Sequence, residues 1–251
     1  MPRLLFTKEG PAVWMSHLDL MRTLQRAFRR GGLMLKHSQG YSPHPELSIV
    51  LPLSVGVSSV CELADFELEP DCSVPVGEIA ARMNPVLPAG IRVLDCYEQG
   101  KKAGKLAWLR SQLHLTYDHD PAVPAAEASS DASLHRIEAL RELFSRPSLV
   151  VEKHSKKGPV ELDIAPMIRE VTVSLQPVGA AIGRPPEAPG IPRDSKSQAA
   201  LVIDLVGTAQ NPTLNPLLLA AAIERYLPEY KPDFVQCRRL EVYDADGNVF
   251  R

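Results

Sequence analysis

Apolar and polar residues along the first hundred positions follow an alternating order of strands and helices. An apolar spacing of two predicts a strand, and a spacing of three to four predicts a helix. Strands are predicted at residues 3–7, 33–37, 47–53, 61–68 and 91–97, and helices at 16–30 and 76–83. Ser16 and Asp19 have the spacing of a capping box at the start of the first helix, and Gly31-Gly32 ends it.

The second part of the chain repeats this order. Strands are predicted at residues 112–117, 149–154, 171–175, 201–206 and 234–243, and helices at 133–144 and 215–226. Each half therefore has the element order of a split βαβ arrangement with an additional strand or hairpin. We predict an α+β protein of tandem ferredoxin-like (split βαβ) domains, with antiparallel sheets and helices on one face.

Composition shifts predict the domain boundaries. Residues 101–107 begin with a small, basic stretch typical of a linker. This places an N-terminal domain at residues 1–100 and a C-terminal domain at residues 108–251. Two segments of the second domain, 118–131 and 177–198, are rich in Pro and Ala and predict mobile loops.

Charge and cysteine content exclude several classes of protein. Lys and Arg number 28 against 30 Asp and Glu, for a net charge of -2, which excludes a strongly basic nucleic-acid-binding composition but leaves a local basic face open. None of the four cysteines, Cys61, Cys72, Cys96 and Cys237, forms a C-x-x-C pair. We therefore expect no metal and no cofactor. The chain lacks a long apolar run, which predicts a cytoplasmic protein that does not enter a membrane.

Four arginines, Arg22, Arg26, Arg29 and Arg30, recur at helical spacing opposite the apolar face of helix 16–30. Guanidinium groups bind phosphates bidentately, so a row of them fits a nucleic-acid backbone. No acid lies between Asp19 and Glu46 to pair with these arginines within the helix. The alternative is a solvated helix face without a ligand.

The stretch "HSQGYSPHPELSIVLPLSVG", residues 37–56, contains too many turn residues for a helix. We predict a rigid recognition loop, with a positive φ at Gly40 and a ring of His44 positioned between Pro43 and Pro45. The substrate-binding candidates in and before this loop are Lys36, His37, Gln39, Gly40, Tyr41, Pro43, His44 and Pro45.

His17 and His44 are the candidates for a general acid or base. Their irregular spacing does not predict a zinc site. The alternative is that His17 is a capping or core residue and that His44 is a loop residue packed by prolines. Trp14, Trp108 and Tyr41 could stack on bases, or could instead pack in the core or at its rim.

The segment from Trp14 to Asp65 resembles the opening signature of the radical-SAM-linked bacterial proteins, domain of unknown function 2344. The shared pattern is S-H-L-D-L, a helix with repeated Arg, S-Q-G-[FY]-[NS]-P-H-P and L-P-x-x-V-G. A looser similarity covers "KKGPVELDIAP", residues 156–166, and Tyr41-Ser42 stands where the family often has Phe-Asn. The resemblance implies a partner radical SAM protein with a cobalamin-type domain.

These observations support three hypotheses of function. The preferred one is a non-catalytic accessory protein that binds or presents an RNA substrate, tRNA or rRNA, for the radical SAM partner. The second is a metal-independent RNA-processing enzyme that uses His17 or His44. The third is a protein-docking module for the radical SAM enzyme. RNA binding would weaken steeply with salt, whereas apolar docking would not.

Overall fold

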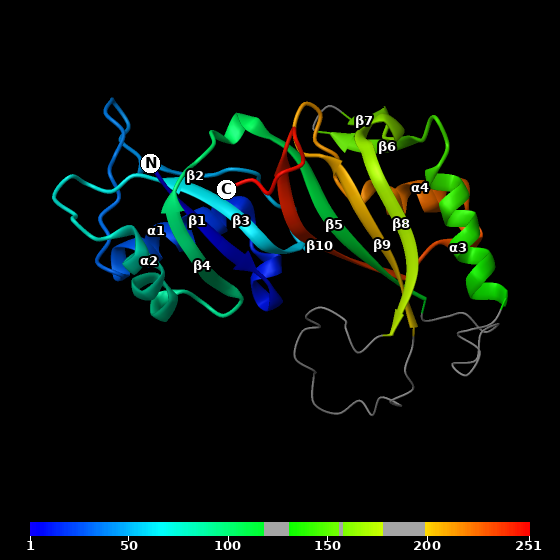
Figure 1. Ribbon diagram of the computed structural model, residues 1–251, viewed down its shortest axis with the longest axis horizontal. Helices are drawn as coiled ribbons and strands as arrows, with labels where there is room; N and C mark the ends of the chain where they lie inside the picture. Colours follow the sequence, from blue (N-terminus) through cyan, green and yellow to red (C-terminus); the bar gives the residue numbers. More distant parts are fainter. Residues whose placement is uncertain (118–130, 156–157, 178–198) are drawn as a thin grey trace. The chain divides into compact units, whose positions relative to one another are not determined.

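A computed structural model describes residues 1–117, 131–155, 158–177 and 199–251. The protein is α+β, as predicted: these residues form four α-helices and a mixed sheet of many strands (Figure 1). The chain divides into two compact units. Unit 1 comprises residues 1–106 and 239–251, and unit 2 comprises residues 107–238.

Unit 1 begins with β1 (Pro2–Lys8), η1 (Gly10–Trp14), α1 (His17–Arg30), β2 (Leu47–Ile49), β3 (Ser58–Phe66), α2 (Val76–Met83), η2 (Asn84–Val86), β4 (Ile91–Glu98) and η3 (Ala103–Lys105). Strand β1 lies between β4 and β3, and β2 pairs with the opposite edge of β3. All three pairings are antiparallel. The final strand, β10 (Phe234–Asp244), also follows β3 in the sheet order.

The first helix forms where its capping residues predict it. The backbone N–H of Asp19 donates to the Ser16 hydroxyl at 3.2 Å, so Ser16 satisfies one of the amide groups that an N-terminus leaves without a partner. Helix α1 then ends at Arg30, followed by Gly31 as its C-cap and by Gly32 with a φ of 70°. The predicted range of α2 also matches the structure.

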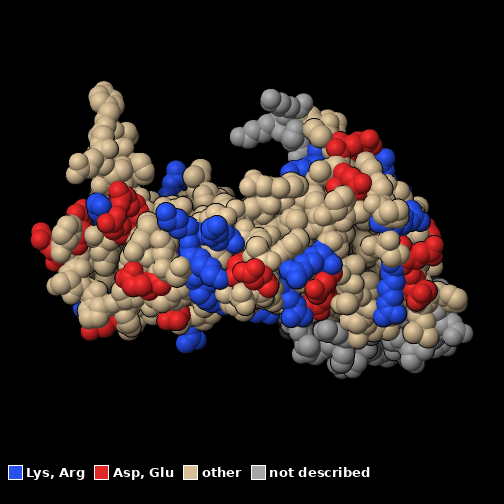
Figure 2. All heavy atoms as spheres, turned by 45° about the horizontal axis from the view of Figure 1, so that its top comes forward, with Lys and Arg blue, Asp and Glu red and all other residues tan. Residues whose placement is uncertain are grey.

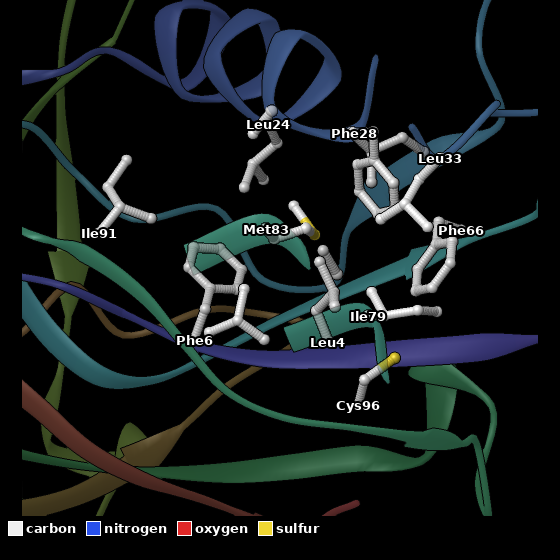
Figure 3. Close-up of a cluster of buried hydrophobic side chains, with 14 of the residues drawn as sticks. Leu4, Phe6, Leu24, Phe28, Leu33, Phe66, Ile79, Met83, Ile91 and Cys96 are labelled. Atoms are coloured by element: carbon white, nitrogen blue, oxygen red, sulfur yellow. The ribbon is translucent and has the colours of Figure 1, made fainter. Parts of the chain in front are cut away.

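The core of unit 1 lies between its sheet and its two helices (Figure 3). Leu4 and Phe6 of β1 meet Leu24 of α1 and Met83 of α2, and all four side chains are fully buried. The helices thus cover the sheet face to which the alternate residues of β1 point. Each large apolar side chain buried here stabilises the fold by about 1.5–3 kcal/mol.

The other face of this sheet is covered by the C-terminal residues. Arg3 adjoins Leu4 in β1, so its side chain points away from the helices. Its guanidinium lies 4.9 Å from the centre of the Phe250 ring, and both side chains are fully buried. Asp65 of β3 accepts two hydrogen bonds from Arg3, at 2.6 and 3.0 Å. The end of the chain is therefore part of the unit 1 interior.

Two strand predictions in unit 1 are wrong. Residues 33–37 make only isolated bridges, Leu35 with Leu68 and His37 with Pro45. The predicted strand 47–53 is shortened to β2, because Leu51 and Pro52 direct their carbonyl groups to the Arg239 side chain instead.

Unit 2 contains β5 (Leu106–Thr116) from its second residue, α3 (Asp131–Phe144), β6 (Val150–Ser155), β7 (Gly158–Asp163), η4 (Ala165–Met167), β8 (Ile168–Pro177), β9 (Ala199–Thr208), α4 (Leu218–Tyr226) and η6 (Pro228–Tyr230). The strand order is β10-β5-β9-β8, and β6 and β7 form a separate hairpin. Strand β7 was not predicted, because Pro159 and Glu161 interrupt the apolar alternation.

The division between the units falls after Leu106, inside the segment predicted as a linker. Residues 239–251 group with unit 1, although the sequence placed all of 108–251 in the second domain. The physical reason is β10, whose first residues belong to unit 2 and whose last residues belong to unit 1. The predicted mobile loops lie outside the described residues, except for Asp131 in α3 and Pro177 in β8.

Candidate functional site

The arginines of α1 form one exposed stripe, which we call the arginine stripe: Arg22, Arg26, Arg29 and Arg30. All four side chains are exposed, whereas Leu20, Leu24, Ala27 and Phe28 of the same helix are buried. The helical repeat places these two sets on opposite sides of α1. The apolar side anchors the helix to the sheet and thereby turns the arginines outward.

The stripe carries positive charge that the protein itself hardly neutralises. Arg22 lies 3.8 Å from the Asp19 carboxylate, and both groups are well exposed. Over the part of the chain that the structure describes, no carboxylate lies within ion-pair distance of Arg26, Arg29 or Arg30. The exposed Arg82 of α2 in the same unit differs, because it pairs with Glu78 at 3.3 Å. The stripe is therefore available to an external anion.

The first half of the predicted recognition loop is a projecting hairpin, residues 38–44, which we call the finger. Its ends are joined by the Ser38 N–H, which donates to the His44 carbonyl at 2.9 Å. The His44 N–H donates to the Ser38 hydroxyl at 3.2 Å, and that hydroxyl lies 2.8 Å from His44 Nδ1. Gly40 has the predicted positive φ, at 152°. His44 thus closes the finger with its ring.

The tip of the finger is uncharged and fully open to solvent. Gln39, Gly40, Tyr41 and Ser42 are all exposed, and no Lys, Arg, Asp or Glu lies between Ser38 and Pro45. Figure 2 shows this projection at the upper left without any charged side chain. The finger therefore offers an aromatic ring and a proline rather than charge to a binding partner.

We expect His44→Ala to lower the free energy of unfolding by no more than about 1 kcal/mol, because the hydrogen bonds it loses are exposed. Ser38→Ala removes the same contact from the other side and should cost a similar amount. Urea denaturation of the two variants tests this. A loss several times larger for His44→Ala alone would mean that the ring supports the fold beyond the finger.

Acidic residues surround the base of the finger. Lys36 Nζ lies 3.0 Å from Glu67 and 3.7 Å from Glu46, and His37 Nδ1 lies 3.9 Å from Glu69. The hydrogen bond from Lys36 to Glu67 raises the pKa of Lys36, and the charge of Glu46 adds to this. Lys36 and His37 are therefore engaged by carboxylates and are poorer anion ligands than the arginine stripe.

The second half of the predicted loop is a structural corner held by buried charges. Arg239 Nη1 donates to the Leu51 carbonyl at 2.8 Å, and Nη2 donates to the Pro52 carbonyl at 3.4 Å. The same guanidinium pairs with Glu62 at 2.9 Å, and both side chains are buried. The L-P-x-x-V-G pattern thus includes two carbonyl groups fixed by an arginine from the far end of the chain.

A buried lysine fixes the segment in front of α1. Lys8 is 1 % exposed, and its Nζ donates to the Val13 carbonyl at 3.1 Å. Burial lowers the pKa of Lys8, although the nearby charge of Glu62 opposes this. The Val13 carbonyl also accepts the Gly56 N–H at 2.9 Å. Lys8 of β1 and Gly56 of the loop motif are therefore both tied to the segment that precedes α1. No pattern in the sequence predicts these contacts.

The two candidate catalytic histidines belong to different elements and make no contact with each other among the hydrogen bonds and ion pairs of the described residues. His17 is exposed at the start of α1, and His44 closes the finger. No hydrogen bond or ion pair connects them, and no group of three or more His, Cys, Asp or Glu that could hold a metal occurs among the described residues. Burial raises the pKa of Cys61 and Cys96 to about 12, so these thiols remain protonated near neutral pH.

The arginine stripe and the finger lie in a part of the chain that matches a known protein family. A model of uncharacterized proteins conserved in bacteria, DUF2344, matches residues 2–216. The chain belongs to this family. The family match includes the arginine stripe, the finger and the corner at Leu51 and Pro52, and it ends before α4 and β10. No curated protein matches the chain.

The family match describes bacterial conservation and assigns no activity. Among the helices of the described residues, none has the length and apolar character needed to cross a bilayer.

Proposed function

We propose that this protein is a non-catalytic accessory protein that binds RNA on the arginine stripe and works with a partner radical SAM enzyme. The observation that carries the proposal is the exposure of Arg26, Arg29 and Arg30 on one helix face, without a carboxylate partner in the described chain. The radical SAM partner with a cobalamin-type domain is implied by the sequence resemblance of the family. tRNA and rRNA are the proposed substrates, and the cytoplasm is the proposed location.

Several properties of the stripe favour RNA over a small anion. Neighbouring arginines three or four residues apart on a helix project about 5–6 Å from one another. A run of four such groups matches an extended row of phosphates better than it matches a single phosphate. Guanidinium groups also bind phosphate oxygens bidentately, and lose less free energy to desolvation than ammonium groups do. A net charge of -2 for the chain means that such binding must be local.

We expect Arg26→Gln to weaken RNA binding by a similar factor for every RNA sequence, because the contact is to phosphate. It should also lower the slope of log affinity against log salt by about 0.7 to 1 unit. Fluorescence anisotropy with labelled tRNA at several salt concentrations measures both quantities. Arg29→Gln should behave in the same way.

Arg82→Gln is the matched control for this experiment. Arg82 lies on α2 of the same unit and is exposed, but it is paired with Glu78. It should leave the affinity and the salt slope unchanged. Equal effects of Arg82→Gln and Arg26→Gln would show general electrostatics rather than a stripe, and unchanged affinity in Arg26→Gln would remove the RNA proposal.

The finger favours a second, protein-docking function for the same unit. Its tip is uncharged, and Tyr41 is fully exposed on a hairpin whose ends are joined by hydrogen bonds. Tyrosine contributes a large contact area at little cost in conformational entropy, and is enriched at protein interfaces. We assign this element to the contact with the partner enzyme. A Tyr41→Ala variant that still captures the purified radical SAM partner with wild-type affinity would contradict this assignment.

We further propose that each unit is a ferredoxin-like split βαβ domain. The support in unit 1 is the strand order β4-β1-β3-β2, and in unit 2 it is the order β10-β5-β9-β8. In both units the fourth strand of the pattern adjoins the first, and the third separates the first from the second. Superposition of the two units in an experimental structure tests this proposal.

A further inference from the structure

An exposed tryptophan directly precedes the arginine stripe. Trp14 ends η1, and α1 begins three residues later at His17. Its side chain is 63 % exposed, which is far more than a core aromatic would be. Leu18, in the first turn of α1, is 63 % exposed as well. A large ring left open to water, a few residues before a row of cations in the sequence, requires an explanation that core packing does not supply.

Hydrogen bonds to the preceding residue hold the backbone that carries Trp14. The preceding carbonyl, that of Val13, accepts hydrogen bonds from the buried Lys8 ammonium at 3.1 Å and from the Gly56 N–H at 2.9 Å. Gly56 has a φ of 84°, and a Cβ at this position would lie 3.7 Å from Cζ3 of the Trp14 ring. The indole therefore lies against a glycine backbone at a fixed point. A ring positioned before its ligand arrives loses little entropy on binding.

The side of α1 that carries the arginines begins in its first turn, four residues after Trp14. Leu18, Arg22 and Arg29 follow at intervals of four and seven residues, so they share one side of α1. With a rise of 1.5 Å per residue, Leu18 and Arg29 are about 16 Å apart along the axis. This length accommodates several nucleotides of an extended strand, and Trp14 precedes the start of that side by four residues.

We propose that Trp14 is a stacking platform for an unpaired base, and that the RNA bound by the arginine stripe is therefore single-stranded at this point. This inference rests on the proposed function and specifies its ligand. The faces of bases in a duplex are covered by their neighbours, whereas the bases of loops and free strands are open to aromatic side chains. Arginines alone would accept either form of RNA.

The test uses the full chain with Trp108→Phe, which leaves Trp14 as its single tryptophan. Trp108 belongs to unit 2 and is no part of this site. A short single-stranded oligouridylate is expected to quench the emission of Trp14, and an RNA duplex of equal length is not. In anisotropy titrations Trp14→Ala should bind the oligouridylate about tenfold more weakly. Trp14→Phe should keep most of the affinity, because it retains an aromatic face.

Trp14→Leu separates stacking from simple apolar contact, because it keeps an apolar side chain and removes the aromatic ring. It should bind as weakly as Trp14→Ala. Leu94→Ala, which alters an exposed apolar residue of β4, is the control and should bind as wild type does. Melting temperatures should be equal across the set, since Trp14 is largely exposed.

Three outcomes contradict the stacking proposal. If Trp14→Leu binds as tightly as wild type, the position makes an apolar contact of the kind used in protein docking. If oligouridylate binds with a normal salt slope but neither quenches Trp14 nor responds to Trp14→Ala, stacking fails while the RNA function stands. If no RNA binds at any salt concentration, the proposed function itself fails, and this inference fails with it.

Discussion

Arg239→Met is expected to lower the free energy of unfolding by about 3 to 5 kcal/mol. The substitution leaves the Glu62 carboxylate, which is fully buried, without its only ion-pair partner within 4 Å in the described residues. It also leaves the Leu51 and Pro52 carbonyls without their donor. Lys8 cannot replace Arg239, because its ammonium is bonded to the Val13 carbonyl. Urea denaturation followed by circular dichroism measures the loss.

Two control variants test whether the loss of stability comes from the burial of the Arg239–Glu62 pair. Arg225→Met breaks an ion pair of similar length, 3.0 Å to Glu161, but both side chains there are substantially exposed, so we expect a loss below about 1 kcal/mol. Adding Glu62→Leu to Arg239→Met removes the stranded charge and should recover part of the stability. Recovery should be incomplete because the two carbonyl groups still lack a donor. Equal losses for Arg225→Met and Arg239→Met would show that the buried pair has no special role.

Phe250→Ala is expected to lower the free energy of unfolding by about 3 to 5 kcal/mol, although it is the penultimate residue of the sequence. Its ring is fully buried and covers the guanidinium of Arg3, and its N–H donates to the Val242 carbonyl at 2.9 Å. Removing the ring opens a cavity and exposes part of the Arg3–Asp65 pair to water. Urea denaturation again gives the magnitude.

Val249→Ala is the control, since Val249 is the adjacent residue and is 47 % exposed. We expect its effect to stay within about 0.5 kcal/mol. Phe250→Leu should fall between the two, because it keeps apolar volume but loses the ring that faces the cation. If all three variants unfold at the same urea concentration as wild type, the C-terminal residues do not contribute to the stability of unit 1.

The helices of unit 1 could be predicted because their signals are local. The capping pair Ser16 and Asp19 and the two glycines after Arg30 lie within the segment whose ends they define. The strand prediction at residues 33–37 failed for a related reason. Leu33 and Leu35 are buried, as the alternation indicated. Alternation reports which side chains face the core, however, and not whether the backbone joins a ladder.

The candidate site also combines features that local sequence patterns predict with contacts between residues far apart in the sequence. The arginine stripe follows from helical spacing, so its exposure was predictable from α1 alone. The role of Leu51 and Pro52 was not predictable, because Arg239 lies 188 residues from Leu51 in the sequence. A buried arginine inside a strand looks the same as an exposed one until its partner is known. The pairing of Lys36 with Glu67 was hidden by the intervening loop.

The sharing of β10 between the units has a consequence for synthesis of the protein. A ribosome releases chains from the N-terminus onward, and domains that are contiguous in sequence can fold as they emerge. Unit 2 is contiguous, and its last residue, Arg238, precedes the final segment of unit 1. Arg3 and Glu62 are made early. They therefore lack their contacts with Phe250 and Arg239 until the last residues of unit 1 have been made. Unit 1 must remain incomplete until residues 239–251 have been made, so a stop codon directly after Arg238 would damage the part of the protein that was made first.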